Sequence, residues 1–274
     1  AGHASITQFI REHRGLVVLT GAGCSLASGI PTYRDEEGTW RRTEPVQHRE
    51  FVSNAARRKR YWSRSMVGWP AVAAARPNAA HVALAELEAA GYVSQVITQN
   101  VDGLHQRAGQ RSVIDLHGNL DGVTCLDCGG REPRRALQDR LLAANPSFEH
   151  RAAPAAPDGD ADLDDASIAG LQIPDCLACG GVLKPDVVFF GGSVPPERTD
   201  ACNRALADAP ALLAVGTSLK VFSGFRLCRA AHRAGTPFAI LNPGWTRADD
   251  IADVKFECES NVLAAVAATL GASA

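Results

Sequence analysis

Short apolar runs that alternate with helical patterns constrain the fold of this chain more than any other feature. The first run, Leu-Val-Val-Leu at residues 16–19, follows Gly15, and similar runs occur at residues 93–97, 113–116, 187–190, 211–215 and 238–241. Helical spacing of apolar residues occurs at residues 6–13, 81–90, 197–207, 225–234 and 261–270. Strands that are buried on both faces and joined by helices form parallel sheets. The pattern therefore predicts an α/β fold with a doubly wound, Rossmann-like, mostly parallel sheet.

Two segments interrupt this alternation, residues 35–76 and residues 121–183. At 274 residues the chain is long enough for one main domain and a smaller module. We predict a Rossmann-like domain of residues 1–34, 77–120 and 184–274, and a small domain of a helical module (35–76) and a four-cysteine module (121–183). The stretch 145–170 is rich in Ala, Pro and Asp, which favours a solvated surface loop. A calcium loop is the alternative, although the ligand spacing of an EF-hand is missing.

The charge balance argues against several classes of partner. The chain has 28 basic and 30 acidic residues and a formal net charge of −2, so no overall field would attract nucleic acid or an anionic membrane. It has no run of about 18 apolar residues and no secretory signal pattern. We expect a soluble cytoplasmic protein, with the mitochondrial matrix as the alternative location. A monomer is favoured.

Four of the eight cysteines form two Cys-x-x-Cys pairs, Cys125 with Cys128 and Cys176 with Cys179. Two glycines follow each pair, which favours two knuckles that present four thiolates to one Zn²⁺. Four thiolates leave no open coordination position, so this zinc is predicted to be structural. The alternatives are a thioredoxin-like redox pair and four unconnected buried thiols. The other cysteines are predicted to be buried small apolar side chains: Cys24, Cys202, Cys228 and Cys258.

A glycine turn, Gly21-Ala22-Gly23, comes directly after the first predicted strand, and Ser25 follows it. Glycines at the carboxyl end of a strand let the backbone approach a pyrophosphate, and the amides of a following helix can bind it. The segment lacks the G-x-G-x-x-G spacing and the Gly-Lys-Ser/Thr of a P-loop. A tight turn between strand and helix is therefore the alternative interpretation.

Polar residues also follow three other predicted strands. Gln99, Asn100 and Asp102 come after residues 93–97, residues 216–218 come after 211–215, and Asn242 comes after 238–241. Ligands of open α/β sheets bind outside the carboxyl ends of the strands. We therefore expect these residues to converge on one crevice.

His117 follows the predicted strand at residues 113–116 and precedes Gly118. A histidine can act as a general base near neutral pH because its unperturbed pKa is about 6.5. A single histidine is more often structural than catalytic. Its place between the 99–102 cluster and the first cysteine pair, at a predicted domain junction, favours a catalytic role.

Together these residues resemble the sirtuin family. The family motifs are Gly-Ala-Gly-x-Ser, Ser-Gly-Ile-Pro, an aromatic-Arg pair, Thr-Gln-Asn-x-Asp-x-Leu-His, His-Gly and two Cys-x-x-Cys pairs, and all occur here in that order. The similarity runs from about residue 6 to the C-terminal helix, and residues 183–191 are most similar to class II sirtuins. The resemblance implies a zinc-containing, NAD-dependent enzyme that transfers acyl groups from protein lysines to ADP-ribose and releases nicotinamide.

The resemblance also assigns residues to the cofactor and the chemistry. His117 would deprotonate a ribose hydroxyl of NAD, and Asn100 would be the second catalytic residue. The family pattern places Ala22, Ser25 and Arg34 near the phosphates, Ser218 and Asn242 near the adenosine, and Ile30, Asn100 and Asp102 around the nicotinamide. The other implied cofactor contacts are Gly21, Gly23, Pro31, Tyr33, Gln99, Val101, Gly216, Thr217, Pro243, Gly244 and Ser260.

An acyl-lysine peptide is the implied protein substrate. It would pair as an extra strand between two segments, whose residues are Val187, Val188, Phe189, Phe190 and Gly191 on one side and Leu219 and Val221 on the other. Residues 187–190 can equally be a core strand, and both interpretations can hold.

Tyr61 and Arg64 resemble the Tyr-x-x-Arg with which class III sirtuins hold acidic acyl groups. Positions i and i+3 share a helix face, so a phenol and a guanidinium could bind one carboxylate. The alternative is a solvated basic helix, since residues 57–60 are all Arg or Lys.

The chain departs from the common family pattern at Leu26, Thr32, Tyr33 and Gly192, which leaves the acyl preference open. Two rival functions use the same crevice. A protein mono-ADP-ribosyltransferase would not need His117 as a base, and a non-catalytic NAD or ADP-ribose sensor would bind without releasing nicotinamide.

Overall fold

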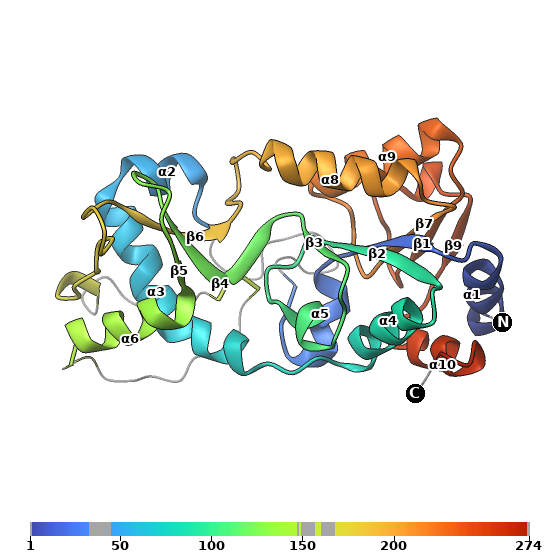
Figure 1. Ribbon diagram of the computed structural model, residues 1–274, viewed down its shortest axis with the longest axis horizontal. Helices are drawn as coiled ribbons and strands as arrows, with labels where there is room; N and C mark the ends of the chain where they lie inside the picture. The colour runs from blue at the N-terminus through green and yellow to red at the C-terminus, as the bar shows by residue number, and fades with distance from the viewer. Residues whose placement is uncertain (1, 33–44, 147, 149–156, 160–167, 273–274) are drawn as a thin grey trace.

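A parallel sheet of six strands forms the centre of the molecule (Figure 1). The computed structural model describes residues 2–32, 45–146, 148, 157–159 and 168–272. Within these residues the strands of the sheet are β1 (Leu16–Thr20), β2 (Val93–Thr98), β3 (Val113–Asp115), β7 (Leu212–Val215), β8 (Phe238–Leu241) and β9 (Val254–Phe256). Their order across the sheet is β3-β2-β1-β7-β8-β9. This confirms the predicted α/β fold.

Strand β1 is the point at which the chain changes its direction of travel across the sheet. It pairs in parallel with β2 on one side and with β7 on the other. Thr20 lies opposite Thr98 and Val215, so the loops that follow these three strands leave the same edge. Doubly wound sheets bind their ligands at this switch point.

Successive residues of the central strands pack on opposite faces of the sheet. Leu16 and Val18 pack with α1 (Gly2–Glu12), α4 (Ala79–Ala89) and α10 (Val262–Thr269). Val17 and Leu19 pack on the other face with α8 (Pro196–Ala207) and α9 (Phe222–Ala234). Figure 1 shows the two groups of helices on the two sides of the sheet. All four side chains are fully buried, which explains why the run at residues 16–19 is apolar throughout.

A smaller antiparallel sheet lies at the end of the molecule away from α1 and α10 (Figure 1). Its strand order is β5 (Arg131–Pro133), β4 (Gly118–Cys125) and β6 (Leu183–Val187). An apolar cluster joins it to α2 (His48–Ser53), α3 (Ala55–Ala74) and α6 (Arg134–Ala144). The buried Trp62 of α3 donates a hydrogen bond of 3.0 Å from its indole to the carbonyl of Leu183. This bond fixes the long helix against the edge of β6.

The prediction that residues 187–190 form a parallel strand of the main sheet is wrong. The strand here is β6, which ends at Val187 and pairs antiparallel with β4. Its residues alternate between buried and half-buried positions, as expected of an antiparallel strand with one solvated face. The apolar run marks buried residues at 187 and 189, but an apolar run alone does not say which sheet buries them.

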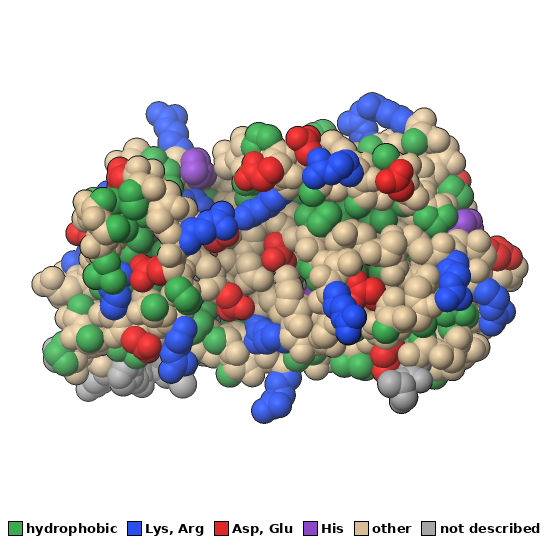
Figure 2. All heavy atoms as spheres, viewed as in Figure 1, with side chains coloured by type: hydrophobic (Ala, Val, Ile, Leu, Met, Phe, Trp, Pro, Cys, Tyr) green, Lys and Arg blue, Asp and Glu red, His purple; other side chains and the backbone are tan. Residues whose placement is uncertain are grey.

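Three short elements complete the described chain: η1 (Ala22–Ser28), α5 (Leu104–Arg107) and η2 (Asp249–Ile251). Strands β4 and β6 cross the domain limits predicted at residues 120 and 184, and the division into domains stays a prediction. None of the described helices combines the length and the apolar character needed to cross a membrane. Figure 2 shows acidic and basic side chains interspersed over the visible face, in agreement with the small net charge.

Candidate active site

A cavity of about 1070 Å³ opens at the carboxyl ends of β1, β2, β7 and β8. Residues of the loops that follow these strands, the last residue of β6 and residues of α3 line it. Those predicted as cofactor or catalytic residues are Gly21, Ala22, Gly23, Gln99, Asn100, Val101, His117, Gly216, Thr217, Ser218, Asn242, Pro243, Gly244 and Ser260. Those predicted as substrate residues are Tyr61, Arg64, Val187, Val188, Phe189, Phe190, Gly191, Leu219 and Val221. The volume suits a ligand of cofactor size.

The glycine turn lies against the loop that follows β7. The amide of Gly23 donates a hydrogen bond of 2.8 Å to the carbonyl of Gly216. A Cβ on Gly21 would lie 2.5 Å from the Cβ of Thr217, and one on Gly23 would lie 2.8 Å from the same carbonyl of Gly216. Both glycines are therefore required by close backbone contact. The turn continues into the 3-10 helix η1 and leaves the cavity side of the backbone open.

A buried polar network holds Asn100 at the cavity wall. Its side-chain amide donates to the carbonyl of Gly21 at 3.0 Å and to the hydroxyl of Ser25 at 3.1 Å. Ser25 in turn donates to Asp102 at 2.7 Å. Ser25 and Asp102 are 1% and 4% exposed and do not line the cavity. Their contact with a ligand, as predicted, would need the loop to move, whereas Ser25 contacts Asn100 directly and Asp102 contacts Ser25.

Two other predicted cofactor residues also lie outside the cavity lining. Ile30 is 2% exposed and packs in the apolar cluster of the small sheet, and Pro31 is half-buried outside the cavity lining. Gln99 lines the cavity and donates to the hydroxyl of Thr217 at 3.0 Å, which ties the end of β2 to the loop after β7. Tyr33 and Arg34 lie outside the described residues.

His117 lines the cavity with its ring held at both nitrogens. Its Nδ1 lies 2.9 Å from the carbonyl of Gln99, and a carbonyl can only accept, so Nδ1 carries the proton. Its Nε2 is then free to accept, and the hydroxyl of Ser223 lies 2.6 Å away. Burial lowers the pKa of His117, so the imidazole is neutral at pH 7. The basic nitrogen therefore faces a hydroxyl at the cavity wall.

The backbone around His117 joins the two sheets. The amide of Val188 donates to the carbonyl of His117 at 2.7 Å. Gly118 has φ +86°, and a Cβ there would lie 1.9 Å from the carbonyl oxygen of Asp186. No other residue type can replace this glycine without displacing β6. His117 is thus fixed between the parallel sheet and the segment that follows β6.

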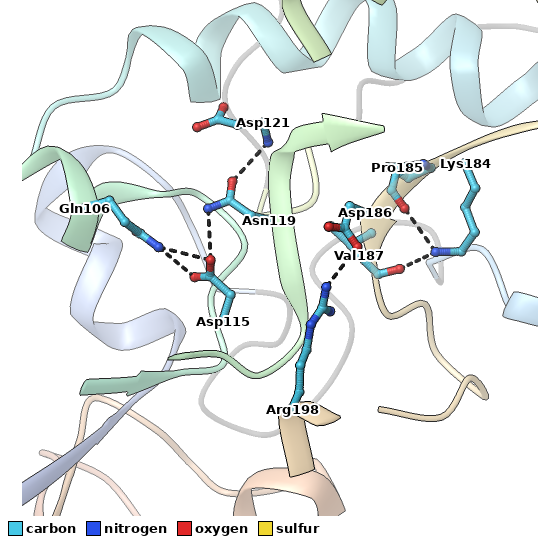
Figure 3. Close-up of polar contacts among 9 residues, drawn as sticks. All are labelled: Gln106, Asp115, Asn119, Asp121, Lys184, Pro185, Asp186, Val187 and Arg198. Carbon is cyan, nitrogen blue, oxygen red and sulfur yellow. Dashed lines mark hydrogen bonds and ion pairs between the residues drawn. The ribbon is translucent and has the colours of Figure 1, made fainter. Parts of the chain in front are cut away.

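Polar side chains reinforce this junction (Figure 3). Gln106 donates to both carboxylate oxygens of Asp115, at 2.9 and 3.0 Å. On the other side of β4, Arg198 of α8 forms an ion pair of 2.9 Å with Asp186 of β6. Lys184 donates to the carbonyls of Pro185 and Val187, and burial lowers its pKa to about 8. The ion pair of Arg198 thus links α8 to β6, the strand that leads into the cavity wall.

The four predicted zinc ligands converge. The sulfurs of Cys125, Cys128, Cys176 and Cys179 lie within 4.8 Å of one another, and two of the sulfur pairs are 3.6 and 3.8 Å apart. Tetrahedral sulfurs at about 2.3 Å from Zn²⁺ would be about 3.8 Å apart. The donor set and its spacing fit a structural zinc.

The two knuckles have the same backbone pattern. The amide of Cys125 donates to the carbonyl of Gly130 at 2.8 Å, and the amide of Cys176 donates to that of Gly181 at 2.9 Å. Gly129 and Gly180 have φ of +71° and +72°, which explains the glycine that follows each pair. Of the other cysteines, Cys24, Cys202 and Cys228 are buried as predicted, whereas Cys258 is only half-buried.

Ser223 and Trp245 are among the cavity-lining residues to which the sequence did not point. Ser223 lies in the first turn of α9, in a segment without a recognisable motif. Trp245 is 65% exposed and lines the cavity beside Gly244. A tryptophan directly after an Asn-Pro-Gly turn at a strand end is a signal that could have identified it.

Comparison with known proteins agrees with this site. The model of the Sir2 family matches residues 21–223. An NAD-dependent protein deacetylase of Xanthomonas campestris pv. campestris is 53% identical over 253 residues, 92% of this chain and 86% of the relative. The human mitochondrial NAD-dependent protein lipoamidase sirtuin-4 is 47% identical over 253 residues, 91% of this chain and 81% of the relative.

Solved structures agree as well. A complex of Sir2, p53 peptide and NAD⁺ is similar with a TM-score of 0.78 and 29% identity, covering 97% of each chain. A Sir2 variant with deacetylated p53 peptide and 3′-O-acetyl-ADP-ribose is similar with a TM-score of 0.80 and 28% identity, covering 100% of each chain.

This chain belongs to the Sir2 family, the sirtuins. It is an NAD-dependent protein deacylase with NAD as co-substrate and a structural zinc.

Proposed function

We propose that His117 is the general base of the deacylation and that Asn100 positions the reacting end of NAD. NAD, when bound, supplies the ribose that accepts the acyl group as nicotinamide leaves. The Nε2 atom of His117 holds a lone pair at the cavity wall, 2.6 Å from the hydroxyl of Ser223. A sugar hydroxyl that replaced this serine hydroxyl would donate its proton to the same atom. The geometry of His117 is the observation that carries the proposal.

Product analysis tests the proposal directly. With an acyl-lysine peptide and NAD we expect O-acyl-ADP-ribose and free nicotinamide in equal amounts, measured by mass spectrometry. ADP-ribose attached to protein would instead indicate mono-ADP-ribosyl transfer. Binding of NAD without release of nicotinamide would indicate a sensor.

The rate should depend on pH through His117. A base must be unprotonated, so activity is lost as the pH falls through the pKa of the ring, which burial lowers below its usual value of about 6.5. We expect the acidic limb of kcat/KM against pH to have its midpoint below about 6.5. A midpoint above this value would contradict the assignment of the limb to His117.

The acyl-lysine peptide would lie between residues 187–191 and residues 219–221. Both segments line the cavity, and solved Sir2 structures contain acetylated peptide. The amide of Val188 is already bonded to His117 and the carbonyl of Phe190 already accepts from the amide of His48. Peptide pairing on this side would use the remaining backbone groups. A location in the cytoplasm is supported by the bacterial relatives.

An acidic acyl chain is favoured by the wall that Tyr61 and Arg64 form. They are 6% and 7% exposed and both line the cavity, so Arg64 is not part of a solvated helix face. The ring of Tyr61 packs edge-on against Phe51 and Phe189 at 5.5 and 5.1 Å. A buried guanidinium beside an aromatic wall can bind a carboxylate at the end of an aliphatic chain.

Replacement of Arg64 by alanine should reduce succinyl-lysine turnover relative to acetyl-lysine turnover. A hydrogen bond to a charged group is worth about 1.5–3 kcal/mol, which corresponds to roughly a 10- to 150-fold change in the ratio of kcat/KM values. The control is Arg58→Ala, which removes an arginine from the same helix outside the cavity lining. An unchanged ratio in Arg64→Ala would contradict the acidic-chain assignment.

A further inference from the structure

Behind the glycine turn, away from the cavity lining, lies a buried cluster of Cys24, His81 and His105. The three residues come from η1, α4 and α5 and are 0%, 0% and 1% exposed. One ligand atom from each lies within 4.8 Å of the other two. The two imidazole rings are 4.8 Å apart with an interplanar angle of 62°. No step of the deacylation described above uses any of the three.

Both histidines are available as ligands at neutral pH. Burial lowers the pKa of His81 to about 4 and that of His105 to about 3, so neither ring must lose a proton before it binds a cation. Burial raises the pKa of the Cys24 thiol to about 12, so the sulfur is protonated. A metal ion would have to displace this single proton, which passes to the solvent as the S–H bond is replaced by a sulfur–metal bond.

His105 has the tautomer that a metal ligand requires. Its Nε2 lies 2.9 Å from the hydroxyl of Thr20, and that hydroxyl donates onward to Thr98 at 2.9 Å. Thr20 therefore accepts the proton of Nε2, and Nδ1 keeps its lone pair. Nδ1 is buried and has no hydrogen-bond partner among the residues that the structure describes. Metal-bound histidines commonly donate from their other ring nitrogen in this way.

We propose that Cys24, His81 and His105 form a second metal site, specific for a thiophilic cation such as Zn²⁺ and separate from the four-cysteine site. Donors of one thiolate and two imidazoles around such an ion would be about 3.3–3.6 Å apart. The three atoms lie within 4.8 Å of one another, so each pair must approach by at most about 1.2–1.5 Å to bind the ion. The carboxylate of Asp102, 4% exposed, acts electrostatically on both Cys24 and His81 and would offset the added positive charge.

Occupation of this site would inhibit the enzyme. His81 would lose one of its two contacts when a ring nitrogen binds the metal. These contacts are 3.4 Å from Nε2 to the Ser25 hydroxyl and 3.3 Å from Nδ1 to the Asn78 amide. Ser25 bonds to Asn100, and Cys24 lies next to Gly23 in the glycine turn. The turn has little room to follow the sulfur, since a Cβ on Gly216 would already lie 2.6 Å from the amide of Cys24. A shift of Cys24 therefore disturbs the wall that holds Asn100.

Cadmium binding to the zinc-loaded enzyme tests the proposal, with a phosphine reductant in place of thiols. We expect one equivalent of Cd²⁺ beyond the metal of the four-cysteine site, measured by mass spectrometry after gel filtration, together with loss of activity that a chelator reverses. Cys24→Ala should lose the additional equivalent and stay active in Cd²⁺. The matched control is Cys202→Ala, which removes another fully buried thiol and should bind as the unmodified enzyme does.

Three results would overturn the proposal. They are saturation at the four-cysteine site alone, an additional equivalent that Cys24→Ala still binds, and inhibition that Cys24→Ala shares. If Cys24→Ala does not fold, ¹¹³Cd NMR of the unmodified enzyme decides. A second resonance from a site with one sulfur and two nitrogens supports the site, and a spectrum with the four-sulfur resonance alone excludes it.

Discussion

Replacement of His117 by alanine should lower the rate of deacylation by about 10²–10⁴-fold, the range that a positioned general base contributes. In the proposed mechanism the imidazole acts on a ribose hydroxyl after nicotinamide has left, so the earlier step would not need it. We therefore expect the variant to retain exchange of labelled nicotinamide into NAD while the release of deacylated peptide falls. The two reactions can be followed in the same assay by radiolabel and mass spectrometry.

The control for this prediction is His232→Ala, because His232 is an exposed residue in the last turn of α9. Zinc content and the thermal unfolding midpoint should be unchanged in both variants. Equal loss of exchange and deacylation in a folded His117→Ala protein would show that the ring serves binding instead of proton transfer. Retention of full deacylation would remove His117 from the mechanism altogether.

Removal of the structural zinc is expected to have the second large effect. Binding of structural Zn²⁺ is worth about 10–16 kcal/mol in small zinc modules, more than the whole stability of many domains. Cys125 is part of the apolar cluster that joins the small sheet to α3 and α6. Loss of the metal should therefore unfold the small sheet and displace the wall at residues 187–191, with loss of activity.

The prediction is tested with the Cys176→Ser variant in the presence of a chelator. We expect a zinc content near zero, a lower thermal unfolding midpoint, and no deacylation. Cys258→Ser is the matched control, since it changes a half-buried cysteine that is not a metal ligand. A zinc-free variant with an unchanged unfolding midpoint would show that the knuckles hold without the ion.

The central strands β1, β7 and β8 of the parallel sheet could be predicted because their residues are buried on both faces, whereas the mostly half-buried strand β9 was not among the predicted strands. Each of β1, β7 and β8 is apolar at every position, apart from Thr20 at the end of β1, so a single run of residues carries the signal. The strand β4 could not be predicted in this way, because it contains Asn119, Asp121 and two glycines. Its pairing with β6 depends on contacts between residues more than 50 positions apart, as in the pair of Gly118 with Val187.

The site residues likewise fall into those that local sequence could predict and those that depend on distant contacts. Polar strand ends and the glycine turn were recognisable because a doubly wound sheet brings them to one edge. The burial of Ser25 and Asp102 behind Asn100 was not, since their spacing is equally compatible with direct ligand contact. The partner of His117, Ser223, lies 106 positions away in the sequence. The Cys24 cluster likewise depends on three segments that only the folded chain brings together.

The hydrogen bond between the carbonyl of His117 and the amide of Val188 connects the base to the surface on which the acyl-lysine peptide is proposed to lie. A peptide whose side chains displace this surface would change the orientation of the imidazole as well as the affinity of the enzyme for that peptide. Target proteins would then differ in kcat as well as in KM. A weakly bound target could in this way be a rapidly processed one.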